Sequence, residues 1–178
     1  MSQNTDVSLP YAEIPVYPTE YTDANVAARM IDGLGFRFYW ASGDLRDEDL
    51  NYRPTDESRS TSETIDHVLG LSHVILNASL KRANGQIDEA ELTFEEKRKQ
   101  ILFNLKKASD ILKSTNNLEQ HTILFERNGN TSEFPFWNNI NGPIADALWH
   151  AGQIVMLRRM SGNPINPKVN VFLGKLND

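Results

Sequence analysis

The stretch "DALWHAGQIVMLRR", residues 146–159, carries the pattern on which the predicted fold depends. Apolar residues recur along its whole length, and at helical spacing they cover nearly the full circumference apart from one narrow polar stripe. A helix that is apolar almost all round is usually packed on every side, as in the interior of a bundle. We therefore expect this segment, extended from Pro143 to Gly162, to be a buried helix that packs against several others.

Three further segments have the length and the period of packed helices. Ser60 and Glu63 have the spacing of a capping box at the start of one, and Thr93 and Glu96 have it at the start of another. The chain of 178 residues is long enough for one domain with a sizeable core. The sequence thus predicts a single all-α domain over 1–178, a four-helix bundle. Its helices are expected at about residues 22–42, 60–80, 93–114 and 143–162.

The remaining segments lack a helical period. Residues 1–21 contain three prolines and predict an extended N-terminal arm, and residues 163–178 predict an extended tail that packs back on the domain. Residues 44–60 are expected to form a loop. Between the third and fourth helices, two β-prone runs flank Asn128-Gly129, which is a strong signal for a small β-hairpin. Pro135 would place the second strand at an edge.

Composition and charge limit the classes of function. No apolar run approaches the roughly 20 residues of a membrane helix, and the first residues lack the basic and apolar regions of a signal peptide. A net charge of -6 without a basic stripe argues against nucleic-acid binding. The absence of cysteine excludes a disulfide framework and a cysteine nucleophile. We expect a cytoplasmic protein that acts on a small-molecule substrate, without a nucleic-acid or membrane partner.

The polar stripe on the 143–162 helix is the candidate site. Asp146, His150 and Gln153 fall within about 60° of one another on a helical wheel. In the interior of a bundle an unpaired carboxylate costs several kcal/mol, so it needs a partner, and a metal ion is one. His67 lies within the apolar arc of the 60–80 helix and would face the same interior.

His67, Asp146 and His150 could therefore form a set of three metal ligands from two helices. Two imidazoles and a carboxylate suit a divalent transition metal such as Zn, Ni, Fe or Mn. Further coordination positions would remain for water or substrate, and the ion would lower the pKa of a bound water or thiol to give a nucleophile near neutral pH. Gln153 is expected to support the ligands, whereas Trp149 and Trp137 are expected in the core or the pocket wall.

Other interpretations of the same residues stay open. An Asp/His pair four residues apart can be an ion pair on a solvated helix face, and His67 can be a hydrogen-bonded core histidine. The chain would then be a metal-free helical bundle that serves as a binding or scaffold protein. A third hypothesis is a small-molecule sensor whose pocket is lined by Trp137, Trp149 and Phe38.

Two stretches of the sequence resemble the DinB-like proteins. In "DEDLNYRPTDESRSTSETIDHVLGLSHVI", residues 47–75, the shared features are a Leu-x-x-Arg-Pro turn, a helix start with Ser and Glu, and then His67. "DALWHAGQIVMLRR" is similar to the last bundle helix of that family, in which two histidines four residues apart are followed by an Arg-Gly-Gln signature. The resemblance covers residues 22–162, with the arm and the tail outside it.

The resemblance implies a four-helix bundle with up-down-down-up topology, often dimeric, that holds a metal on three histidines. His67 matches the first of these histidines and His150 the third, but Asp146 stands at the second position. A His/Asp/His site leaves the metal open, because a carboxylate favours harder ions than imidazole does. Ala151 replaces the arginine of the signature, and its Gly-Gln is retained at 152–153.

The resemblance also implies an enzyme class. Characterised DinB-like proteins include transferases and isomerases that use low-molecular-weight thiols in place of glutathione, and others are described as metal-dependent hydrolases. We therefore expect a metal-activated thiol or water that attacks a small electrophile, in a possible homodimer, while substrate and general base stay open.

Overall fold

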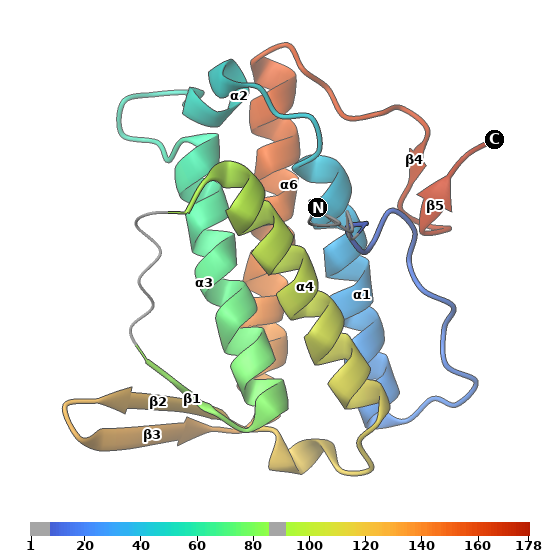
Figure 1. Cartoon of the computed structure of the whole chain (residues 1–178), viewed down its shortest axis with the longest axis vertical. Coiled ribbons are helices and arrows are strands. Elements are labelled where there is room, and N and C mark those ends of the chain that lie inside the picture. Colours follow the sequence, from blue (N-terminus) through green and yellow to red (C-terminus); the bar gives the residue numbers. More distant parts are fainter. Residues whose placement is uncertain (1–7, 86–91) are drawn as a thin grey trace, which may run out of the picture.

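The computed structural model describes residues 8–85 and 92–178 of the chain. The chain is mostly helical, and four long helices pack side by side (Figure 1). They are α1 (Asp23–Ala41), α3 (Thr61–Leu80), α4 (Phe94–Lys113) and α6 (Ala145–Met160). Two small sheets accompany the helices. The shorter helical elements are α2 (Asp47–Asn51), η1 (Leu118–Gln120), α5 (Phe136–Asn139) and η2 (Ile140–Ile144).

The long helices run in two pairs of opposite direction. Lys97, in the first turn of α4, donates to Asp66 in the first half of α3 at 2.6 Å, as expected for two helices that run the same way. Arg158, near the end of α6, donates to the carbonyl of Ala41 at the end of α1, at 3.0 Å. Figure 1 shows α1 and α6 running up the page and α3 and α4 running down. Because α3 and α6 run in opposite directions, the start of α3 lies at the same end of the bundle as the end of α6.

The predicted capping boxes are confirmed at both helix starts. The Ser60 backbone N–H donates to the Glu63 carboxylate at 2.7 Å, and the Glu63 N–H donates back to the Ser60 hydroxyl at 3.2 Å. The Thr93 N–H donates to Glu96 in the same way at 2.8 Å. These bonds satisfy backbone donors that the first helical turn leaves free, so each helix begins at a defined residue.

The predicted loop at 44–60 contains a short helix, α2. Its Asp49 is completely buried and accepts hydrogen bonds from the backbone and the guanidinium of Arg46, and from the hydroxyl of Ser161 at 2.6 Å. The last of these partners lies more than a hundred residues away in the sequence. A single turn held in this way has no hydrophobic period, which is why the sequence predicts only a loop here.

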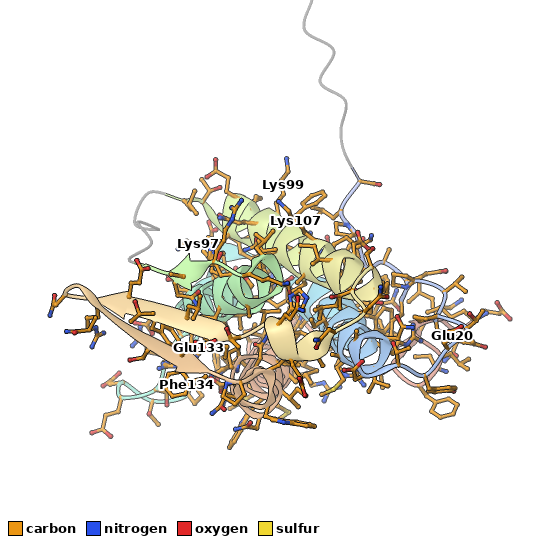
Figure 2. All side chains as sticks on the ribbon, turned by 90° about the horizontal axis from the view of Figure 1, so that it is seen from below. Glu20, Lys97, Lys99, Lys107, Glu133 and Phe134 are labelled. Carbon is orange, nitrogen blue, oxygen red and sulfur yellow. The ribbon has the colours of Figure 1, made fainter. Side chains whose placement is uncertain are left out.

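A three-stranded sheet lies at one end of the bundle. Strands β2 (Ile123–Arg127) and β3 (Asn130–Phe134) pair antiparallel around Asn128-Gly129, whose φ values of 52° and 77° suit a two-residue turn. The two-residue strand β1 (Ala83–Asn84), which the sequence does not predict, pairs parallel with β2, and β3 lies at an edge. Seen from below, the sheet projects from one side of the bundle and Glu20 lies at the opposite side (Figure 2).

The last long helix, α6, begins two residues after Pro143, close to the predicted start, and a short helical segment leads into it. The helical path begins at Phe136 and passes through α5 and the π-helical turn η2 before α6. Pro143 lies inside η2, beside Gly142, which has φ -96° and ψ -106°. A proline has no N–H for the carbonyl one turn earlier, so the helix continues through a kink rather than in regular α form.

The N-terminal arm packs against α1, and the C-terminal tail packs against the arm. In the arm, the Tyr11 hydroxyl donates to the buried Asp32 of α1 at 3.0 Å. The Ile14 N–H donates to the carbonyl of Gly174 in the tail at 2.8 Å. The tail forms a two-stranded antiparallel ribbon, β4 (Val169–Asn170) with β5 (Lys175–Leu176). Within the described part of the chain, no helix is long and apolar enough to cross a membrane.

Candidate metal centre

Three side chains from two helices meet at one point between α3 and α6. The His67 Nε2 atom of α3 lies 3.1 Å from one carboxylate oxygen of Asp146, and the His150 Nε2 atom lies 3.3 Å from the other. The two imidazole rings are 4.6 Å apart between centroids, with their planes at 86°. One ligand atom from each residue lies within 4.8 Å of the other two. The structure thus brings together the three residues that the sequence selected.

The separations fit the donor set of a metal ion. Neighbouring ligand atoms on an ion with bonds of about 2.0–2.2 Å lie about 2.8–3.6 Å apart at octahedral or tetrahedral angles. The two nitrogen-to-oxygen distances, 3.1 and 3.3 Å, fall in this range, each to a different oxygen of Asp146. Two imidazole nitrogens and a carboxylate oxygen are donors that divalent transition metals accept. The cluster could therefore hold an ion without a large rearrangement of either helix.

Gln153 fixes the orientation of one histidine. The Nδ1 atom of His150 lies 2.7 Å from Oε1 of Gln153, one helical turn further along α6. An amide oxygen only accepts hydrogen bonds, so Nδ1 carries the proton and Nε2 presents its lone pair to the cluster. Metal-binding histidines commonly have such a partner on the second ring nitrogen. Gln153 therefore lies where the sequence predicted a supporting residue.

The site lies at the rim of the bundle, and the expected position in a dry interior is wrong. The side chains of His67 and Asp146 are 35% and 40% exposed. On the neighbouring face of α6, Trp149 is 72% exposed, and Met156 and Met160 are each more than half exposed. These apolar side chains made the helix resemble one that is buried on all sides, although only one of its faces packs against the bundle. The cluster is accordingly open to a small molecule.

A groove of about 650 Å³ begins at His150 and follows α6 away from the cluster. Trp149 and Met156 of α6 provide apolar wall, and Thr64 of α3 lies on the other side. Arg59, from the segment between α2 and α3, also lines the groove. No pattern in the sequence points to Thr64 or Arg59, because both become neighbours of α6 only through packing.

The three aromatic residues of the predicted sensor pocket lie in different environments. Phe38 is fully buried in the core of the bundle. Trp137 is mostly exposed and is not among the residues that line the groove beside His150. Trp149 alone of the three lines that groove. The hypothesis of a sensor pocket built from these residues is therefore wrong.

Arg158 is a buried residue whose role the sequence did not reveal. It is 3% exposed, and its guanidinium donates to the carbonyls of Trp40, Ala41 and Gly43 at 2.8–3.1 Å. Burial lowers the pKa of this group, and the nearby carboxylate of Asp49 opposes the shift. The guanidinium satisfies carbonyls that the end of α1 leaves free, and it fastens α6 to α1. This contact holds the helix that carries two of the three clustered side chains.

The chain matches no protein-family model, no curated protein and no solved structure. The geometry of the cluster and the two sequence motifs are therefore the observations that bear on function.

Proposed function

We propose that the chain is a divalent-metal-dependent enzyme of the DinB-like kind. The observation that carries this proposal is the convergence of His67, Asp146 and His150 at the mouth of a groove. The directions of the long helices support it, because they correspond to an up-down-down-up four-helix bundle. The paired strands β2 and β3 lie between the last two long helices, as a hairpin added to such a bundle would.

His67 and His150 would each hold the ion through Nε2, and Asp146 through a carboxylate oxygen. When bound, a divalent ion acts as a Lewis acid that lowers the pKa of a coordinated water or thiol. Asp146 supplies a negative charge where the resemblance implies a third imidazole, so harder ions such as Mn or Fe are favoured relative to an all-histidine site. Gln153 keeps the imidazole of His150 in the tautomer that leaves Nε2 unprotonated.

The groove would place the substrate. Its wall at Trp149 and Met156 is apolar, and it reaches the cluster at His150. A small electrophile that lies in the groove would have its reactive atom next to the ligand set, where the nucleophile forms. The reaction class is attack by a thiol or a water: thiol S-transfer, isomerisation through a thiol adduct, or hydrolysis. A low-molecular-weight thiol is the expected co-substrate of the first two, because the chain has no cysteine.

One contact favours the alternative of a metal-free binding or scaffold protein. The Asp146 carboxylate lies within hydrogen-bond distance of His67, so it has a partner without any ion. The two functions differ in a measurable way, because a preformed metal site must stabilise the folded chain when it is filled.

Metal content and metal-dependent unfolding test the proposal. The full chain, purified without chelator and loaded in turn with Zn, Ni, Fe(II) or Mn, should hold one equivalent of at least one ion. A concentration of 100 times Kd adds about 2.7 kcal/mol of stability, which corresponds to roughly 5–10 °C in Tm for a chain of this length. His67→Ala and His150→Ala should abolish the binding and the shift. His73→Ala, on the same helix as His67 but outside the cluster, should retain both. An unmodified chain that binds none of the four ions would establish the metal-free alternative.

A further inference from the structure

A second groove, of about 670 Å³, lies between the N-terminal arm, α1 and the C-terminal tail. It shares no lining residue with the groove beside His150. Two of its walls, the N-terminal arm and the C-terminal tail, lie outside the part of the sequence that resembles the DinB-like proteins. The proposed metal centre therefore does not explain this groove.

The groove contains two guanidinium groups without a carboxylate partner. Arg29 and Arg37 lie on one face of α1, two turns apart, with Gly33 between them. Arg29 donates to the carbonyl of Pro15 at 2.7 Å and Arg37 to the carbonyl of Gly33 at 3.0 Å, so each keeps further donors available. Both are half-buried, and no carboxylate of residues 8–85 or 92–178 lies within ion-pair distance of either. The one carboxylate that lines the groove, Glu20, is exposed.

An unpaired pair of cations is unexpected on this chain. The formal net charge is -6, so acidic side chains are in excess, yet none in the described part of the chain forms an ion pair with Arg29 or Arg37. Partly buried charges are normally paired, because removal from water costs free energy. The two guanidinium groups therefore indicate a place for an anion that comes from outside the chain.

The walls around these cations are aromatic and apolar. The Arg29 guanidinium lies over the ring of Tyr17, 5.7 Å from its centroid. Tyr21 and Phe172 also line the groove and are 98% and 93% exposed, while Leu148 of α6 lies on its inner side. A bare inorganic anion would leave these surfaces in water. An organic acid would cover them with its apolar body and place its carboxylate on the guanidinium groups.

The walls are held in place by the body of the domain. Tyr11 anchors the arm, since its ring packs so closely on Gly35 that a Cβ there would lie 2.4 Å from it. The Ile14 side chain packs on Gly174 of the tail in the same way, and a Cβ added at that glycine would lie 2.7 Å from the Ile14 Cδ1 atom. These close contacts tie the arm to α1 and the tail to the arm, so the walls of the groove are in place before a ligand binds, which lowers the entropic cost of binding.

We propose that this groove is a second ligand site, which binds a small organic acid with an aromatic or apolar body through Arg29 and Arg37. The site is independent of the metal centre, and the proposal does not need that centre to hold an ion.

The test uses 3-phenylpropionate as the probe and 3-phenylpropionamide as its uncharged counterpart. The full chain is titrated with each and followed by amide chemical shifts. The acid should perturb signals in residues 26–37 and 171–174, and the amide should bind at least about fivefold more weakly. Arg37→Gln should weaken the acid by a similar factor. Arg127→Gln removes the same charge from the exposed strand β2 and should leave the affinity unchanged.

Three results would overturn the proposal. The first is that the acid does not bind to the unmodified chain at millimolar concentration. The second is that the acid and the amide bind to the unmodified chain with equal affinity. Neither result depends on whether a variant folds. The third is that the unmodified chain does not bind the acid and sediments as a dimer, whereas the Phe172→Asp variant sediments as a monomer. A second copy of the chain would then cover the groove. If the chain binds the acid but no metal ion, the second ligand site is supported and the proposed metal-dependent function is refuted.

Discussion

Replacing Gln153 by leucine should weaken metal binding without touching a ligand. The side chain of Gln153 accepts the Nδ1 proton of His150 at 2.7 Å and reaches neither His67 nor Asp146 through a hydrogen bond in the described structure. Leucine has a similar volume but cannot accept that proton. The imidazole of His150 would then lose the contact that fixes its tautomer and its rotation.

The magnitude follows from what such a partner contributes. Loss of the hydrogen-bond acceptor behind a metal-binding histidine typically costs 10- to 100-fold in metal affinity, which is about 1.4–2.7 kcal/mol. Gln153 is half-buried, and its partner His150 is the most buried of the three clustered residues, so water replaces the lost acceptor only in part. We therefore expect a loss of about 10-fold or more, measured by competition with a chelator of known affinity.

A matched variant makes the test specific. Gln153→Glu keeps the acceptor and gives it a charge, so it should bind the ion at least as tightly as the unmodified chain. Gln100→Leu removes the amide beside His73, outside the cluster, and should not change the affinity. Equal affinities for Gln153→Leu and the unmodified chain would show that His150 does not bind through Nε2 as inferred.

Two further predictions concern the contacts that position the site. Arg158→Met leaves three carbonyls at the end of α1 without their donor and should lower the free energy of unfolding by about 3–5 kcal/mol. Arg159→Met, at the exposed neighbouring position, should change the free energy of unfolding by no more than about 0.5 kcal/mol. Urea unfolding measures both values. The hydrogen bond from Arg46 holds the pKa of Asp49 well below its usual range, so its stabilisation is complete above the unfolded pKa of about 3.9 and is lost as pH falls through the folded value. Asp49→Asn should therefore be destabilised near neutral pH by about 2–4 kcal/mol, and the difference from the unmodified chain should shrink steadily below about pH 4; a constant difference would refute the role of the charge.

The helix positions and the candidate ligand set could be predicted because both depend on local spacing. Ser60 with Glu63 satisfies backbone donors within one turn, so this signal does not need the rest of the fold. Asp146 and His150 lie one turn apart on any α-helix, and His67 follows from the apolar arc of its own helix. These patterns are complete within short segments of the chain.

The environment of the site could not be predicted, because it depends on which face of α6 is covered. Periodicity shows that Trp149 and Met156 are apolar, but it does not show that they stay in solvent. The buried Arg158 is the opposite case, since its acceptors at the end of α1 lie more than a hundred residues away. A helix wheel cannot distinguish a charged residue on the surface from one that fastens two helices together.

The most direct test of the metal centre is anomalous diffraction from crystals of the full chain grown with the ion that binds most tightly. The account predicts one strong peak between α3 and α6, about 2.0–2.2 Å from His67 Nε2, His150 Nε2 and an oxygen of Asp146. A structure at full metal loading with no peak at this point, and with Asp146 still hydrogen-bonded to His67, would contradict it.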